Sequence, residues 1–487
     1  MKLTSDVVSA WRQHRLIGAA AFAFLVGCGG GTAGGPGDGG AGGVGGPPHD
    51  ASGGTEVAEA DAGAGPAGSV DGAAPALVTY HQHVAPLLAT HCNGCHTSGG
   101  IAPFALDTAE AAVAHAGAIK VMTRTGVMPP WPPGPLSPPL RHERKLNNAE
   151  LSILTKWADS GAPLGDAAAA APIGKPTHVD IGTSDLTFDI GVDYVPDETL
   201  TDDYRCFLVD LGVQQPRMVT GYRITPGNRK IVHHVITTLF TAADRPALAA
   251  LDAQSPGRAG WPCVGGVVPG DSEAGVDGSL GSWVPGVDSV LLPEGTGSAL
   301  RANDVAVVQV HYNLRGGKDP DRTKVEVKFA PRGTEAQLQQ LATVRLLKRQ
   351  LLLPAGQTNI VQENTQRARL WTLGRFYPDG DAHVVAVAGH MHTLGKRITL
   401  ERKNAQGTTV LLDIPAWHFH WQGSYQLVQP ITIAADDELT IRCIYDNTAA
   451  QRAHQGSTAP VVDVRWGEGT EDEMCIGYVT VVDRKPY

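Results

Sequence analysis

The spacing of apolar residues changes character along the chain. Between residues 77 and 168 the apolar positions recur with the three-to-four-residue period of an amphipathic helix. Leu151, Leu154 and Trp157 follow this spacing, and Gly161 stands where a helix would end. We therefore predict a compact α-helical domain over 77–168. Its predicted helices are Tyr80–His91, Thr108–Thr123 and Asn147–Ser160.

From about residue 178 to the C-terminus, short segments rich in Val, Ile and Thr alternate between apolar and polar positions. Gly, Pro and Asp separate them, a pattern typical of antiparallel β-sandwiches. The region is long for one sandwich, so we predict two, over 178–345 and 346–487, meeting near Leu341–Ile360. The clearest strand candidates are Ile231–Phe240, Val305–Tyr312, Val384–Leu394 and Leu439–Asp446.

The N-terminus has the features of an export signal. Lys2, Arg12 and Arg15 precede the apolar run Leu16–Val26, which is too short to cross a bilayer as a helix. The run ends at Cys28 in the tetrapeptide LVGC, which looks like a bacterial lipobox. We predict a signal peptide over 1–28, lipidation of Cys28, and an exported protein anchored to a bacterial membrane, facing the periplasm or the cell exterior. The alternative is an ordinary signal peptide with a chance cysteine.

Composition adds two constraints. Residues 29–76 are Gly, Ala, Pro and Asp with almost no large apolar side chain, so we predict a disordered linker. The 487-residue chain has a formal charge of −10, and nothing in it suggests the basic footprint of a nucleic-acid-binding protein.

The motif Cys92-Asn-Gly-Cys95-His96 has the C-x-x-C-H spacing of c-type haem attachment. The two thiols bond to the porphyrin vinyl groups, and His96 then lies below the iron as an axial ligand. A thioredoxin-like pair or half of a zinc site are the alternatives, but no second cysteine pair for zinc follows nearby.

Met128, in a Met-Pro-Pro loop between two predicted helices, is the candidate for the sixth iron ligand. The arrangement resembles class I cytochromes c, in which a methionine on such a loop completes the coordination and raises the haem potential. Met122 is the other candidate for the sixth iron ligand, but it falls inside a predicted helix, and we expect its side chain to pack in the core of the helical domain. Trp131 and Trp157 either pack the haem or belong to an ordinary core.

Four segments farther along carry potential metal ligands: His233-His234, His311, His390-Met391-His392 and Met474-Cys475. Alternate residues of a strand face the same side, so His390 and His392 can reach one ion. A thioether such as that of Met474 selects copper over zinc. Adjacent strand residues face opposite sides, so His233 and His234 can share an ion with His311 only if their strand ends or bulges there.

In this order the four segments resemble the copper type II, ascorbate-dependent monooxygenases, the family of peptidylglycine α-hydroxylating monooxygenase and dopamine β-monooxygenase. The resemblance spans roughly Asp180 to Tyr487 and includes Gln309, two residues before His311. It implies two jelly-roll-like sandwiches and two copper ions. His233, His234 and His311 would hold the electron-transfer copper. His390, His392 and Met474 would hold the copper at which dioxygen and substrate react.

The seven cysteines leave four after lipid and haem attachment, and four can pair in three ways. The resemblance implies Cys443 with Cys475, which leaves Cys206 with Cys263. Two bridges suit an exported protein.

The sequence also departs from the family. The arginine that holds the carboxylate of a peptide substrate is Ala388 here, and an asparagine is Ile476. Tyr478 keeps its place, either as a substrate contact or as a packing residue. A peptide ending in glycine is therefore not the expected substrate.

The resemblance and the haem motif together predict a copper monooxygenase that hydroxylates a C–H bond of a small substrate with dioxygen. Its electrons would pass from a periplasmic donor through one haem c. One alternative is a non-catalytic haem and copper protein for electron transfer or copper binding, and another is a surface-recognition module with a vestigial metal site.

Overall fold

The computed structural model describes residues 77–98, 102–173, 179–255, 257–264, 266–267, 278–284, 287, 289–314, 317–371 and 381–486. Cys28, the predicted signal peptide and the predicted linker 29–76 lie outside the described residues. No helix in the described part of the chain is long and apolar enough to cross a membrane.

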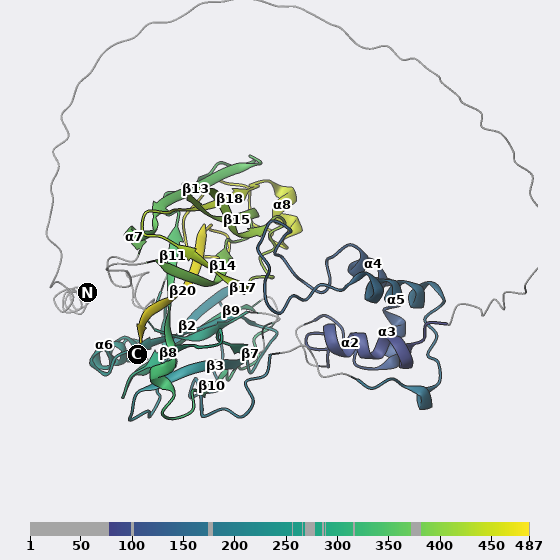
Figure 1. The fold of residues 1–487 in the computed structure, drawn as a ribbon, viewed down its shortest axis with the longest axis horizontal. Helices are drawn as coiled ribbons and strands as arrows, with labels where there is room; N and C mark the ends of the chain where they lie inside the picture. Colours follow the sequence, from purple (N-terminus) through teal and green to yellow (C-terminus); the bar gives the residue numbers. More distant parts are fainter. Residues whose placement is uncertain are drawn as a thin grey trace, which may run out of the picture. The chain divides into compact units, whose positions relative to one another are not determined.

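The described chain is mostly β-sheet, and several of its few helices gather near the N-terminal end of the described residues (Figure 1). These helices enclose a small core that includes Leu88, Leu154 and the fully buried Trp157. Asn147 begins α5 with a capping box, since its side chain accepts from Ala149 and Glu150 while Glu150 bonds back to it. Gly161 follows with a φ of 79°. The elements are η1 (Tyr80–Val84), α2 (Ala85–His91), α3 (Ala109–Ala114), α4 (Ala116–Arg124), α5 (Asn148–Asp159) and η2 (Ala167–Ala169).

Two of the predicted helices are interrupted. The segment Tyr80–His91 starts as a π-helical turn, because Pro86 has no N–H to donate into a regular first turn. The predicted helix Thr108–Thr123 is two helices, α3 and α4, because His115 leaves helical geometry at ψ 9°. Thr108 caps the first of them, with its hydroxyl accepting from the Ala111 amide. The helices alone do not make this region a cytochrome c domain, so that assignment remains a prediction.

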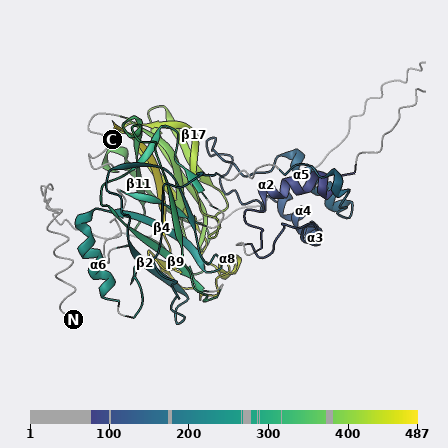
Figure 2. The same cartoon turned by 90° about the horizontal axis from the view of Figure 1, so that it is seen from below.

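The rest of the described chain forms β-sheets, which Figure 2 shows from a second direction. The strands up to residue 329 are β1 (Leu186–Asp189), β2 (Asp202–Asp210), β3 (Arg217–Thr225), β4 (Val232–Phe240), β5 (Trp261–Pro262), β6 (Ser279–Trp283), β7 (Ser289–Leu291), β8 (Thr296–Leu300), β9 (Val305–Asn313) and β10 (Lys324–Phe329). The later strands are β11 (Gln339–Leu347), β12 (Leu352–Leu353), β13 (Ile360–Arg367), β14 (Ala382–His390), β15 (Gly395–Asn404), β16 (Gly407–Ile414), β17 (Ser424–Ile433), β18 (Glu438–Tyr445), β19 (Val464–Arg465) and β20 (Ile476–Pro486). Short helices lie between them: η3 (Ala242–Asp244), α6 (Arg245–Ala253), η5 (Glu335–Gln337), α7 (Ala368–Trp371) and α8 (Ala449–His454).

Two hydrophobic cores lie between these sheets, and the β-sandwich character fits the alternating pattern. The five-stranded sheet β5-β2-β9-β4-β6 shares its core with β1, β10, β3 and β8. The four-stranded sheet β13-β18-β15-β16 shares the other core with β11, β20, β14 and β17. Both predicted disulfides are present, Cys206–Cys263 in the first sandwich and Cys443–Cys475 in the second.

One sheet runs through both sandwiches. Strands β8 and β11 pair in parallel over two residues of each, which joins β1-β10-β3-β8 to β11-β20-β14-β17. Parallel pairing was not expected from the antiparallel pattern. The boundary predicted at residue 345 falls within β11, which pairs along its length with β20 of the second sandwich.

The proline-rich segment after Met128 attaches to the second sandwich. The Gly134 amide donates to the Asp413 carbonyl at 2.7 Å, and Leu140 forms a β-bridge with Leu427. A Cβ on Gly134 would lie 2.7 Å from the ring of Pro415, so this close approach requires glycine. Trp131 packs on this core, edge-on to Tyr425 at 5.5 Å. Trp131 therefore packs against the core of the second sandwich, whereas Trp157 belongs to the core of the helices.

Candidate metal centres

His233, His234 and His311 form one cluster on neighbouring strands β4 and β9. Nδ1 of His311 lies 3.2 Å from Nδ1 of His233 and 3.3 Å from Nδ1 of His234. The pairing of β4 with β9 slips between Val232 and His234, so a bulge lets consecutive histidines face the same point. This is the geometry that the sequence required for the two to share an ion. The candidate ligand atoms of all three lie within 4.8 Å of one another.

Asp202 on β2 fixes the tautomer of His311. Its Oδ1 lies 2.8 Å from Nε2 of His311, and a carboxylate can only accept, so this ring nitrogen carries the proton. Nδ1 of the neutral ring therefore offers its lone pair to the centre of the cluster. Asn313 and Thr470 also donate to Asp202 Oδ1, each at 3.2 Å, and hold the carboxylate in place.

Aromatic rings enclose the cluster. Tyr204 stacks on His311 with ring centroids 4.0 Å apart, and Phe419 stacks on His233 at 4.6 Å. Burial lowers the pKa of His311 and lowers the pKa of His233 and of His234 further, and the neighbouring imidazoles add to this for both. Nε2 of His233 is buried without a hydrogen-bond partner among the described residues. The three rings are thus neutral at pH 7, and a neutral imidazole has the lone pair that binds a metal ion.

His390 and His392 form a second cluster, with ring centroids 5.0 Å apart and planes at 83°. The expectation that both lie on one strand face is wrong, because β14 ends at His390 and His392 lies between β14 and β15. His392 lies just beyond the strand, before the turn at residues 393 and 394, and its ring still meets that of His390.

Each ring of the second cluster also has its tautomer set by an acceptor. Nδ1 of His392 donates to the Asp472 carbonyl at 3.0 Å. Nδ1 of His390 donates to Oε1 of Gln422 at 2.6 Å, and Gln422 is oriented by its own Nε2 donating to the Phe419 carbonyl. The Nε2 atoms of both histidines therefore keep their lone pairs. Burial lowers the pKa of His390 and lowers that of His392 to about 3.

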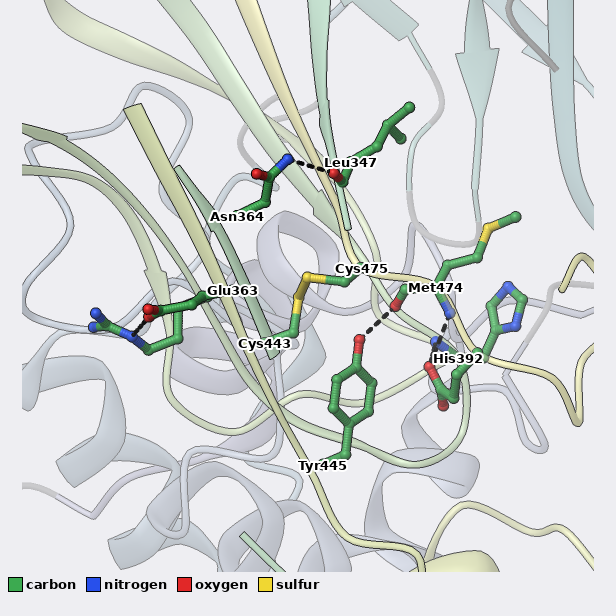
Figure 3. Close-up of a disulfide and its surroundings, with 10 residues drawn as sticks. Leu347, Glu363, Asn364, His392, Cys443, Tyr445, Met474 and Cys475 are labelled. Carbon is green, nitrogen blue, oxygen red and sulfur yellow. Dashed lines mark hydrogen bonds and ion pairs between the residues drawn. A yellow bond between two sulfur atoms is a disulfide. The ribbon is translucent and has the colours of Figure 1, made fainter. Parts of the chain in front are cut away.

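Met474 is buried, and its backbone is tied to that of His392 because both amides donate to the Glu473 carboxylate. Figure 3 shows its side chain and the His392 imidazole on the same side of the backbone, near the Cys443–Cys475 disulfide. The Tyr445 hydroxyl donates to the Met474 carbonyl at 2.8 Å, which fixes the segment that follows β19.

Glu473 joins the two segments that carry His392 and Met474. Its fully buried carboxylate accepts from the amides of His392 at 2.9 Å, Leu394 at 2.6 Å and Met474 at 3.2 Å. Burial raises the pKa of Glu473 to about 8, and the three amide donors oppose this shift. The side chain holds the turn after β14 against the start of the Met474 segment.

Tyr478 lies on the same sheet face as His390. On paired strands β14 and β20, Ala388 lies opposite Tyr478 and His390 lies opposite Ile476. Burial raises the pKa of Tyr478.

The haem-motif residues lie at the end of α2 and just after it. Nδ1 of His96 donates to the Phe104 carbonyl at 3.0 Å, which leaves the lone pair on Nε2. Cys92 and Cys95 are in neither disulfide. Met128 is half-buried after α4. Met122, expected in the helix core, is instead 44% exposed on α4, so that expectation is wrong.

Asp202, Gln422 and Glu473 are functional candidates that sequence reasoning missed. Asp202 and Gln422 have no fixed spacing to the histidines they orient, since the contacts cross between strands and loops. Glu473 directly precedes Met474, and an acidic residue next to a candidate ligand is the one sequence signal that could have drawn attention to it. Gln309 donates to the Cys263 carbonyl and so positions the first disulfide instead of a ligand.

The first cluster fits a metal ion. Imidazole nitrogens about 2.0–2.1 Å from a tetrahedral ion lie about 3.3–3.4 Å from one another. The separations of 3.2 and 3.3 Å between Nδ1 atoms match this spacing. Imidazole suits zinc and copper alike, and a buried thioether beside two imidazoles favours copper at the second cluster.

Residues 375–484 match the family model of the C-terminal domain of copper type II ascorbate-dependent monooxygenases. The matched span includes His390, His392 and Met474. It begins after β4 and β9, so the first cluster rests on its own geometry. The match and the histidine triad support copper, and the match supports an oxidoreductase.

Comparisons with whole chains add little. No curated protein matches this chain. The major capsid protein P2 of bacteriophage PM2 is 10% identical, with a TM-score of 0.22, over 62% of this chain and all of that one. A Paenibacillus xanthan lyase is 12% identical, with a TM-score of 0.15, over 68% of this chain and 29% of that one. Similarity this weak carries no argument about fold or function.

The role of Asp202 is testable by replacing it with alanine. Without the carboxylate, the proton of His311 is free to move to Nδ1, so affinity of the triad for Cu(I) should fall about 10-fold or more. Chelator competition on the apoprotein measures this. Asp210→Ala on the same strand removes an exposed carboxylate paired with Arg245 and serves as the control. Equal losses in both variants would refute the assignment.

The burial of His392 predicts a pH-dependent stability. The unfolded ring binds a proton below about pH 6.5, whereas the folded ring does so only at about pH 3. The contribution of His392 to the free energy of unfolding is fully present above about pH 6.5. Below this pH it falls by about 1.4 kcal/mol per pH unit. His392→Gln should remove this component from the free energy of urea unfolding of the apoprotein. His383→Gln, on the neighbouring strand β14, should keep the wild-type slope; an unchanged slope in His392→Gln contradicts the prediction.

Proposed function

We propose that this protein is a copper-dependent monooxygenase that hydroxylates a C–H bond of a small substrate with dioxygen. The observation that carries the proposal is the pair of unlike clusters: a triad of neutral imidazoles, and two imidazoles with a buried methionine inside the span matched to the copper monooxygenase domain.

The ligand sets differ in their chemistry. His233, His234 and His311 would hold one copper ion with nitrogen alone, a set suited to passing electrons. His390, His392 and Met474 would hold the other, where the thioether favours Cu(I). Bound copper would supply the one-electron redox chemistry that lets dioxygen oxidise a C–H bond.

The chain's own residues prepare both sites. Asp202, Gln422 and the Asp472 carbonyl keep the inward nitrogens unprotonated, and burial keeps water away from the rings. Tyr478, Ala388 and Ile476 lie on the sheet face beside His390, where a substrate would approach. This face carries an alanine where the peptide enzyme of the family has its arginine, which favours a substrate other than a peptide carboxylate.

The electron supply we propose is a haem c in the helical region. Cys92 and Cys95 would bond to the porphyrin, with His96 and Met128 as the iron ligands. The His96 bond to the Phe104 carbonyl supports its role, because iron-ligating histidines need their other nitrogen held. A periplasmic carrier would reduce the haem, and lipidation at Cys28 would keep the protein at a bacterial membrane.

Metal content and product labelling test the proposal. The full chain, loaded with copper, should hold roughly two ions, and Met474→Ile or His390→Ala should lower this to roughly one. With isotopically labelled dioxygen and a reductant, hydroxylated products of a small-molecule screen should carry the label. His383→Gln controls for loss of a histidine from β14. Two tight copper ions without any labelled product would identify a non-catalytic carrier, and fewer ions would end the proposal.

The haem relay is tested separately by stopped-flow reduction. Reduced haem should reoxidise at least about 10-fold faster when oxidised copper fills the sites, because one electron moves from haem iron to copper. His311→Ala should abolish the acceleration if the triad is the acceptor. A reoxidation rate independent of copper would refute the relay while leaving the monooxygenase proposal intact.

A further inference from the structure

The segment Trp417–Gln422, between β16 and β17, has the sequence WHFHWQ, and neither of its histidines belongs to the two clusters. Its side chains and backbone nevertheless contact three of the cluster histidines. Phe419 is 4% exposed, so its ring is held in a fixed environment.

Phe419 lies between the clusters. Its ring stacks on His233 with centroids 4.6 Å apart and planes at 18°. The same ring meets His392 edge-to-face, with centroids 6.0 Å apart and planes at 83°. Both are favourable aromatic geometries, so the orientation of one imidazole constrains the other through a single ring.

Hydrogen bonds extend this link to His390. The Phe419 carbonyl accepts from Nε2 of Gln422 at 2.8 Å, and Oε1 of Gln422 accepts from Nδ1 of His390 at 2.6 Å. Gln455 holds the segment from the other side, since its Oε1 accepts from the Phe419 amide at 3.1 Å. A displacement of Phe419 therefore moves the acceptor that orients His390.

Trp417 adds a second tie to the same turn. Its Nε1 donates to the His392 carbonyl at 3.0 Å, and its own carbonyl accepts from Nε2 of Gln455 at 3.2 Å. Gln455 thus bonds to both Trp417 and Phe419, which makes the segment one connected unit.

We infer that the segment Trp417–Gln422 couples the two clusters, with Phe419 as the shared positioning residue, so that filling one cluster with copper strengthens binding at the other. The inference rests on the proposed function, since it takes both clusters as copper sites.

The coupling has a physical origin in ordering. A metal ion at the triad fixes the His233 ring, which fixes the Phe419 ring stacked on it and, through Gln422, the acceptor of His390. The second ion then binds to a cluster that is already ordered, so the conformational entropy of these residues is lost only once. By linkage the effect is reciprocal.

The experiment compares Cu(I) affinities by anaerobic chelator competition on the full-length apoprotein. Affinity of the His390 and His392 cluster is measured with the triad filled, in the wild type, and with it disabled, in His233→Ala/His234→Ala. We expect the filled triad to raise this affinity about 5-fold or more. In Phe419→Leu, which keeps an apolar side chain but loses the ring, the ratio should fall to near one.

Controls separate coupling from loss of fold. Phe329→Leu changes a phenylalanine of similar burial in the first core and should keep the wild-type ratio. Gln422→Leu removes the acceptor of His390 together with the bond to the Phe419 carbonyl: it should weaken that cluster about 10-fold, remove the coupling and leave the triad's own affinity unchanged. A wild-type ratio near one, or an undiminished ratio in Phe419→Leu, overturns the inference while two bound copper ions still support the proposed function. Absence of copper binding would overturn both.

Discussion

Both metal centres depend on how buried imidazoles are oriented: an acceptor that holds the ring proton on one side leaves the lone pair on the other. Asp202, the Asp472 carbonyl and Gln422 each supply that acceptor, for His311, His392 and His390. Burial then removes the charged form of the rings. The acceptors come from β2, from the segment before Met474 and from the connection between β16 and β17, so the chemistry of each site depends on elements that contribute no ligand.

The two sandwiches bring these elements together. Strand β9 lies between β2 and β4, which places Asp202 and His234 on either side of His311 in the same sheet. In the second sandwich, Glu473 satisfies three backbone amides that would otherwise be buried without partners. The Cys443–Cys475 disulfide holds the chain directly after Met474. Fold and site are therefore built from the same hydrogen bonds.

Much of this was predictable from the chain itself. The alternating pattern located β4, β9 and β18 to within a residue or two. For His233 and His234 to share an ion, the sequence required that their strand end or bulge there, and the structure contains the bulge. The end of β14 at His390 was not predictable, because Met391-His392 is as compatible with a strand as with a turn until Glu473 folds against it. Nor was the exposed Met122, since helical periodicity does not say which face the remaining chain covers. The orienting acceptors escape any local pattern because they act across long sequence separations.

The bonds that pin Gly134 and Leu140 to the second sandwich have a consequence for kinetics. Gly134 lies only a few residues after Met128. A redox group carried by the helices would therefore be held near the β-sheets by a short tether. Confinement of this kind corresponds to an effective concentration in the millimolar range. Electron delivery between the two parts would then be first-order and insensitive to dilution.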